Sequence, residues 1–142
     1  TLLAGDWYNE LGSHLILTPD SKGGLTGMYD SAVGRAHYFY TLTGRFDTNP
    51  PQDDKDGNPY GVSVGWAVTW KNDTAGNSNS TSTWSGQYFA ATKNVVERII
   101  TQWLLTQSTD RILIWDATNV GADTFVREKP TDSEIAKAMQ LR

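Results

Sequence analysis

The chain has 142 residues, a formal net charge of −4 from 16 acidic and 12 basic side chains, and no cysteine. The length predicts one domain, residues 1–142, and the missing cysteine excludes disulfides and thiolate chemistry. The charges form no basic block of the kind that binds nucleic acid, and no apolar run approaches the ~20 residues that cross a bilayer, so we expect neither nucleic-acid nor membrane partners.

The composition indicates an all-β fold with many turns. Six Trp, six Tyr and 13 Gly occur in a chain with few helical patterns. Short β-type segments alternate with clusters of Gly, Pro, Asn, Asp and Ser. In chain order, we predict strands over residues 5–11, 13–18, 25–31, 37–46, 61–70, 82–91, 95–107 and 111–128, the last of them interrupted.

The connections are also recognisable from their residue types. Residues 19–24 predict a hairpin turn, and residues 48–59 a long exposed loop. Thr131 and Glu134 have the spacing of a capping box, which predicts a short helix in the tail, residues 131–142. Eight sequential strands predict an eight-stranded antiparallel up-and-down β-barrel with its core over residues 5–130, because closure removes the sheet edges.

Residues of equal parity on a strand share one face, and this places tryptophans and hydroxyls together inside the barrel. Each Trp alone could simply fill the core, and most Ser and Thr could be exposed. The combination is unlike an ordinary core of Val, Leu and Ile, and it favours a pocket. The residues that share a face in this way are Trp66, Val68 and Trp70; Ser80, Ser82 and Trp84; Trp103 and Leu105; and Tyr29, Ser31 and Val33.

Several segments, in this order along the chain, resemble the avidin and streptavidin family. They are Gly5-Asp6-Trp7-Tyr8-Asn9-Glu10-Leu11-Gly12-Ser13, residues 25–34, Leu42-Thr43-Gly44-Arg45, Gly65-Trp66-Ala67-Val68-Thr69-Trp70, residues 83–88, residues 101–106 and Val120-Gly121-Ala122-Asp123-Thr124-Phe125. The resemblance covers most of residues 5–130. It implies tight, non-covalent binding of biotin, with sequestration of the vitamin as a defence or antinutrient protein.

The resemblance also implies roles for individual residues. Asn9, Ser13 and Tyr29 match donors to the ureido oxygen of biotin, and Asp123 and Ser31 match acceptors for its N–H groups. Ser82 matches a hydroxyl facing the thioether sulfur. The carboxylate of the tail would be bound by Ser80 and by backbone N–H groups near Gly34 and Arg35, and Val33 would also belong to the site. The apolar box around the ring and the tail would consist of Trp70, Trp84 and Trp103, with Leu105 beside them.

The predicted strand segments 95–106 and 111–115 carry apolar residues on both faces. Ile99, Trp103 and Leu105 lie on one face, and Ile100 and Leu104 on the other. A lone antiparallel barrel has one wet face, so the second apolar face predicts a homo-oligomer. We expect a homotetramer in which Trp115 completes the ligand site of a neighbouring subunit, as the resemblance implies. The alternative is that Trp115 fills the core of its own barrel.

Two other functions are open from the residues alone. A lipocalin-type carrier would share the Gly5-Asp6-Trp7 start but would line its cavity mainly with apolar groups. An enzyme is disfavoured, because His14 and His37 are the only histidines and no nucleophile motif is present. We expect His14 to face solvent, and we expect no catalytic residue, metal or cofactor. The acceptor patterns at Asn72 and Asn79 hint at glycosylation and hence at a secreted protein.

Overall fold

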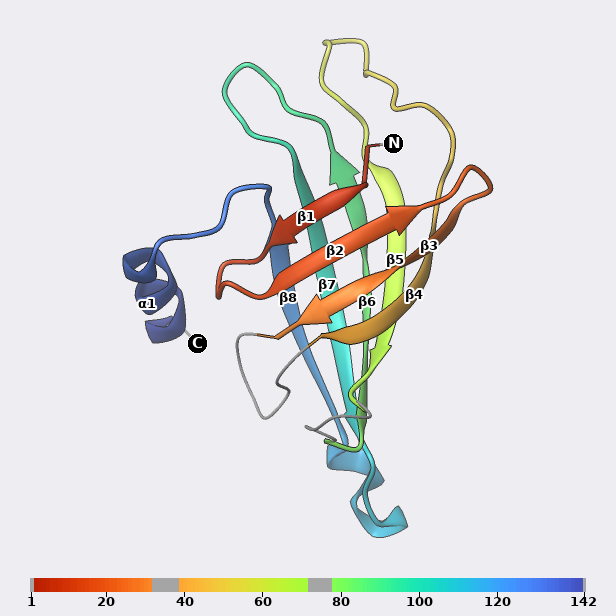
Figure 1. The fold of residues 1–142 in the computed structure, drawn as a ribbon, viewed down its shortest axis with the longest axis vertical. Coiled ribbons are helices and arrows are strands. Elements are labelled where there is room, and N and C mark those ends of the chain that lie inside the picture. The colour runs from red at the N-terminus through yellow and green to blue at the C-terminus, as the bar shows by residue number, and fades with distance from the viewer. Residues whose placement is uncertain (1, 32–38, 72–77, 142) are drawn as a thin grey trace.

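The structure is a computed structural model that describes residues 2–31, 39–71 and 78–141. Its eight strands form one antiparallel sheet in which each strand pairs with the next (Figure 1). The elements in chain order are β1 (Gly5–Tyr8), β2 (His14–Pro19), β3 (Gly24–Asp30), β4 (Tyr40–Phe46), β5 (Val62–Thr69), β6 (Ser80–Phe89), β7 (Arg98–Gln107), the 3₁₀ helix η1 (Arg111–Asp116), β8 (Thr118–Phe125) and α1 (Asp132–Gln140).

The two edges of the curled sheet meet where the last residue of β1 lies beside the residue that follows β8. Tyr8 and Val126 form an antiparallel bridge. Each donates its backbone N–H to the carbonyl of the other over 2.8 Å. The predicted all-β up-and-down architecture is confirmed, and the strand order follows the chain without a crossover.

The interior of the curled sheet holds the hydrophobic core. On β5, Val64, Trp66 and Val68 are buried, whereas Ser63 and Thr69 on the opposite face are exposed. This is the alternation expected when one face packs inward and the other meets solvent. The side chains buried most completely include Trp7, Leu15, Leu42, Val68, Ile99 and Phe125.

The predicted strand over residues 111–128 is wrong in its first part. Residues 111–116 form η1, and β8 begins only at Thr118. The reason is the pairing of β7 with β8, which begins at Thr106 and Thr118 and leaves the residues between them as a connection. A segment without a partner strand cannot satisfy its backbone groups by pairing, so the apolar run folds on itself.

The predicted first strand is too long at its end. β1 stops at Tyr8, because the side-chain oxygen of Asn9 accepts the backbone N–H groups of Leu11 and Ser13 and so begins a turn. Such local bonds compete with strand pairing. The next strands start or stop within a few residues of the prediction, and residues 37 and 38 of the fourth lie outside the described residues.

The predicted turn and terminal helix are both present. Asp20 accepts the backbone N–H groups of Lys22 and Gly24 over 2.8 Å each, which closes the hairpin between β2 and β3. At the C-terminus, Thr131 and Glu134 form a reciprocal capping box that starts α1. Within the described parts of the chain, neither helix is long and apolar enough to span a bilayer.

Candidate ligand-binding site

Most of the predicted site residues that the structure describes are buried on the inner face of the sheet. Their exposed fractions are low even for the polar members, with Asn9 at 3%, Ser13 at 1% and Asp123 at 5%. Buried polar groups are costly unless they are hydrogen-bonded, so their partners decide what the site can do. The buried members of the predicted set are Asn9, Ser13, Tyr29, Trp70, Ser80, Ser82, Trp84 and Asp123.

The turn after β1 fixes the orientation of Asn9. Its Oδ1 atom accepts the N–H of Leu11 at 3.0 Å and that of Ser13 at 2.9 Å. Because these two donors must face an oxygen, the amide nitrogen Nδ2 is on the other side, 3.5 Å from the hydroxyl oxygen of Tyr29. Asn9 therefore presents N–H groups, and not its carbonyl, toward Tyr29.

Asp123 is held from two sides on β8. Its Oδ2 atom accepts the indole N–H of Trp84 at 3.0 Å, and its backbone carbonyl accepts the hydroxyl of Thr101 at 2.9 Å. A buried carboxylate fixed in this way is an acceptor with a defined direction. The sequence analysis did not identify Thr101. Its parity with Trp103 and Leu105 on β7 was the signal that could have found it.

Aromatic rings connect the donor and acceptor groups. The ring of Tyr29 lies 4.9 Å from that of Trp84 and 5.6 Å from that of Trp70, measured between centroids. The indole N–H of Trp70 donates to Oγ of Ser82 over 2.9 Å. Ring contacts and hydrogen bonds thus link these four residues to Asn9 and Asp123 in one continuous cluster, whose rings exclude water from the polar groups.

Two further rings extend this cluster. Tyr40, which the sequence analysis did not single out, lies 5.1 Å from Trp70 between ring centroids, and its parity with Leu42 on β4 marks it as inward-facing. Trp66 stacks on Trp84 at 5.7 Å. Its indole nitrogen is buried and has no hydrogen-bond partner among the described residues.

The remaining predicted residues lie farther from the centre of the cluster or outside the described residues. Trp103 and Leu105 are half-buried and pack against the core, opposite Trp84 and Ser82 on β6. Ser80 is buried, with its hydroxyl 2.9 Å from that of Ser78, and Ser31 is half-buried just after β3. Val33, Gly34 and Arg35, together with His37, lie outside the described residues.

Trp115 has a different environment from the other predicted tryptophans. It lies on η1 and is 78% exposed, so the alternative in which it fills the core of its own barrel is wrong. Its neighbours Ile112 and Ile114 are 84% and 72% exposed. One barrel thus presents an apolar helix at the end of the molecule where β7 leads into β8 (Figure 1).

The sequence predicts that His14 faces solvent, but in the structure other side chains cover its ring. Its ring stacks on Tyr8 at 4.6 Å, meets the edge of Phe39 at 5.6 Å, and has Nε2 3.5 Å from a carboxylate oxygen of Asp6. These contacts cover the imidazole on the outer face of β2. Among the described residues, no three His, Asp or Glu side chains are grouped so that they could hold a metal ion.

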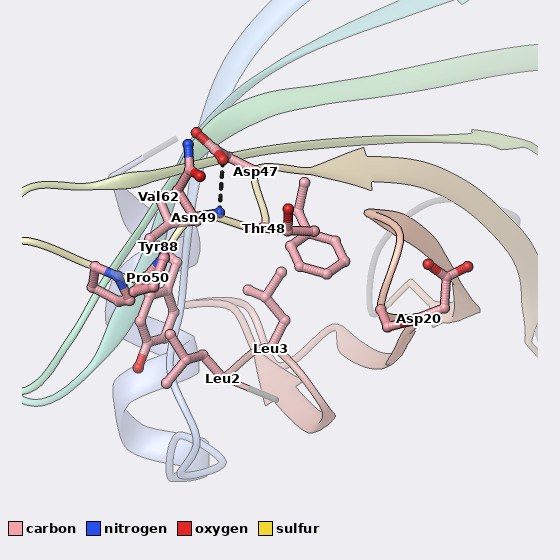
Figure 2. A pocket seen from close by; sticks show the side chains of 12 residues that line it. Leu2, Leu3, Asp20, Asp47, Thr48, Asn49, Pro50, Val62 and Tyr88 are labelled. Carbon is pink, nitrogen blue, oxygen red and sulfur yellow. Dashed lines mark hydrogen bonds between the residues drawn. The ribbon is translucent and has the colours of Figure 1, made fainter.

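A separate apolar pocket of about 230 Å³ lies between the N-terminal residues and the start of the loop after β4 (Figure 2). Leu2, Leu3, Pro50 and Tyr88 contribute to its walls, and none of the predicted site residues lines it. The predicted cluster and this pocket are therefore different places in the molecule.

Comparison with known proteins agrees with this arrangement. The family model described as the avidin family matches residues 1–128. Avidin from Gallus gallus is 31% identical over 127 residues, an alignment that covers 88% of this chain and 77% of the avidin chain. With a family match over most of its length, and with the curled eight-stranded sheet expected of such a barrel, the chain belongs to the avidin family.

Proposed function

We propose that the chain binds biotin tightly and releases it chemically unchanged. Membership of the avidin family makes it a binding protein and not an enzyme. The observation that carries the proposal is the buried cluster in which the amide donor of Asn9 and the carboxylate of Asp123 flank the aromatic rings of Tyr29 and Trp84.

The cluster is complementary to the chemistry of biotin. The ureido group offers one acceptor oxygen and two N–H donors beside an apolar thioether ring. Asn9 Nδ2, the Tyr29 hydroxyl and the Ser13 hydroxyl would donate to the oxygen, and Asp123 and Ser31 would accept the N–H groups. Donors and a carboxylate that are already fixed by Leu11, Ser13 and Trp84 need little reorganisation when the ligand enters.

The rest of the site would hold the sulfur and the tail. Ser82 would face the thioether, although its hydroxyl accepts the Trp70 indole N–H in the structure and would have to serve both partners. Trp70, Trp84, Trp103 and Leu105 would enclose the apolar part of the ligand. Ser80 and the residues 33–35 would bind the carboxylate of the tail.

The assembly that we propose is a homotetramer. Ile100 and Leu104 on the outer face of β7 are 46% and 49% exposed, and Val120, which pairs with Leu104 on β8, is 73% exposed. An apolar patch of this kind on an antiparallel sheet favours association. Trp115 from one subunit would then cover the site of its neighbour. We further propose that the protein is secreted and sequesters biotin as a defence or antinutrient protein.

A calorimetric or Trp-fluorescence titration with biotin tests the proposal. Binding tighter than micromolar, with recovery of unaltered biotin, is the expected result. A dissociation constant at or above about 1 µM, equivalent to about 8 kcal/mol, would show that the cluster is not a preorganised biotin site. Fatty acids and retinoids in the same assay separate this function from that of a lipocalin-type carrier. They should bind weakly, because their apolar chains offer the buried polar groups no hydrogen-bond partner.

A further inference from the structure

The turn formed by residues 9–13 carries two of the proposed ureido donors, Asn9 and Ser13, and is well fixed internally. The two bonds to Asn9 Oδ1 are joined by a backbone bond from Gly12 N–H to the Asn9 carbonyl at 3.0 Å. Gly12 has φ +85°, a conformation that favours glycine. The two edges of the sheet are joined along a seam whose last backbone pair is Tyr8 with Val126, and the turn lies beyond that pair. Its position relative to β8 therefore depends on side-chain contacts.

Glu10 provides the first of these contacts. Its Oε2 atom accepts the backbone N–H of Thr124 at 3.2 Å, across 114 positions of sequence. Thr124 directly follows Asp123. The bond continues the seam with a side chain where backbone pairing has ended, and it connects the turn that bears the donors to the strand that bears the acceptor.

The C-terminal helix provides the second contact. The side chain of Ile135 lies over Gly12, so closely that a Cβ atom added at Gly12 would be 2.9 Å from Ile135 Cδ1. Helix α1 is held in shape by its capping box, and none of its residues is fully buried. It begins at residue 132, beyond the 1–128 range of the family match. The contact is thus made by a part of the chain that lies outside the family match.

We propose that Glu10 and Ile135 are positioning residues that brace the 9–13 turn from outside and slow the release of the ligand. The proposal rests on the proposed function, since the ligand is the one whose ureido oxygen Asn9 and Ser13 would bind. Glu10 sets the separation between the turn and Asp123. Ile135 limits movement of the turn away from the barrel. A small displacement of donors in a water-excluded site weakens every bond that they make there.

Dissociation of biotin from the full-length protein tests the brace. Glu10→Ala removes the bond to Thr124 and is expected to speed dissociation roughly tenfold. Glu10→Gln keeps an acceptor oxygen of the same reach and is expected to stay near the wild-type rate. Ile135→Ala is expected to speed dissociation about threefold. Met139→Ala, on the same helix but 47% exposed, is the matched control and should leave the rate unchanged.

Hydrogen exchange of the unliganded protein gives a readout that does not depend on biotin. The backbone amides of Leu11 and Ser13 should exchange faster in Glu10→Ala and Ile135→Ala than in wild type, because the turn opens more often. If the wild-type chain fails to bind biotin, the proposed function is wrong. The exchange rates still show whether Glu10 and Ile135 hold the turn in place. Dissociation within twofold of wild type and unchanged exchange in both variants would overturn it, as would a Glu10→Gln variant that behaves like Glu10→Ala.

Discussion

Arg127 joins several parts of one end of the barrel, and its removal is expected to destabilise the protein strongly. Its guanidinium carbon lies 3.7 Å from the centroid of the Trp7 ring. Nη1 donates to the carbonyls of Ala4 (2.8 Å) and Asp6 (3.1 Å), and Nη2 donates to that of Leu2 (2.8 Å). Nε donates to Glu97 at 3.0 Å. One planar cation therefore fixes the N-terminal residues and the loop after β6 to the end of β8.

The expected loss in Arg127→Ala can be worked from these contacts. Three hydrogen bonds to carbonyls contribute about 0.5–1.5 kcal/mol each, and the cation–π contact contributes about 0.5–1 kcal/mol. The ion pair with Glu97 adds at most about 1 kcal/mol, since its side chains are 33% and 30% exposed. Exposed carbonyls regain water in the variant, so we expect a total of about 2–4 kcal/mol. For a chain of this length, that lowers the melting temperature by roughly 6–12 °C.

Thermal and denaturant unfolding of the unliganded protein, at one fixed protein concentration, measures this loss. Arg45→Ala is the matched control, because Arg45 donates to one carbonyl, that of Lys22, over 2.9 Å from an exposed position. It should cost less than about 1 kcal/mol. Arg127→Lys keeps the charge but loses the fork that reaches several carbonyls, so it should recover only a minor part of the loss. An Arg127→Ala variant within 1 kcal/mol of Arg45→Ala would refute the reasoning.

The remaining predictions concern pH, the acceptor and the outer helix. Burial, together with donation of its hydroxyl to Glu97 at 2.7 Å, raises the pKa of Tyr88 to about 12. The folded state therefore keeps a proton that the unfolded state loses near pH 10, and stability should fall between about pH 10 and 12. Tyr88→Phe should flatten that fall in alkaline unfolding curves, and an unchanged slope would contradict the assignment. Asp123→Ala should weaken biotin binding by about 1.5–3 kcal/mol in titrations, whereas unchanged dissociation would reject its role as an acceptor. Trp115→Lys should weaken both biotin binding and subunit association in light scattering without loss of the β-type circular dichroism spectrum. A tight-binding wild-type monomer, or a variant that unfolds, would rule out the role across subunits.

The parts of the fold that the sequence predicts well are those where residues alternate with a period of two. Trp66 and Val68 on β5 and Trp70 directly after it are all buried, because one inward face forces every second residue into the core. The same rule correctly brings Tyr29, Ser82 and Trp84 into the interior. Residue parity along the strands therefore predicts much of the buried cluster.

The errors arise where pairing partners or side-chain bonds decide the backbone. Ile112, Leu113 and Ile114 have the composition of a strand, but nothing within that segment shows that the register of β7 with β8 leaves it without a partner. At Asn9, the side chain ends β1 by accepting two amides, and that choice depends on the local turn. Sequence spacing also could not show that the Trp84 indole holds Asp123, because the two residues come from different strands.

The polar groups of the cluster are fixed by groups that a ligand would not have to displace. Asn9 is oriented by the backbone of its own turn, Asp123 by the Trp84 indole and Thr101, and the Tyr29 ring by its packing against Trp70 and Trp84. The free-energy cost of ordering these polar groups then arises when the protein folds, and it does not reduce the affinity for the ligand. On the proposed function, the same design predicts that residues remote from the ligand would also affect its binding. The seam at Tyr8 and Val126, extended by Glu10, would then set how far apart the proposed donors and acceptor lie, so that the closure of the barrel would be part of the recognition geometry.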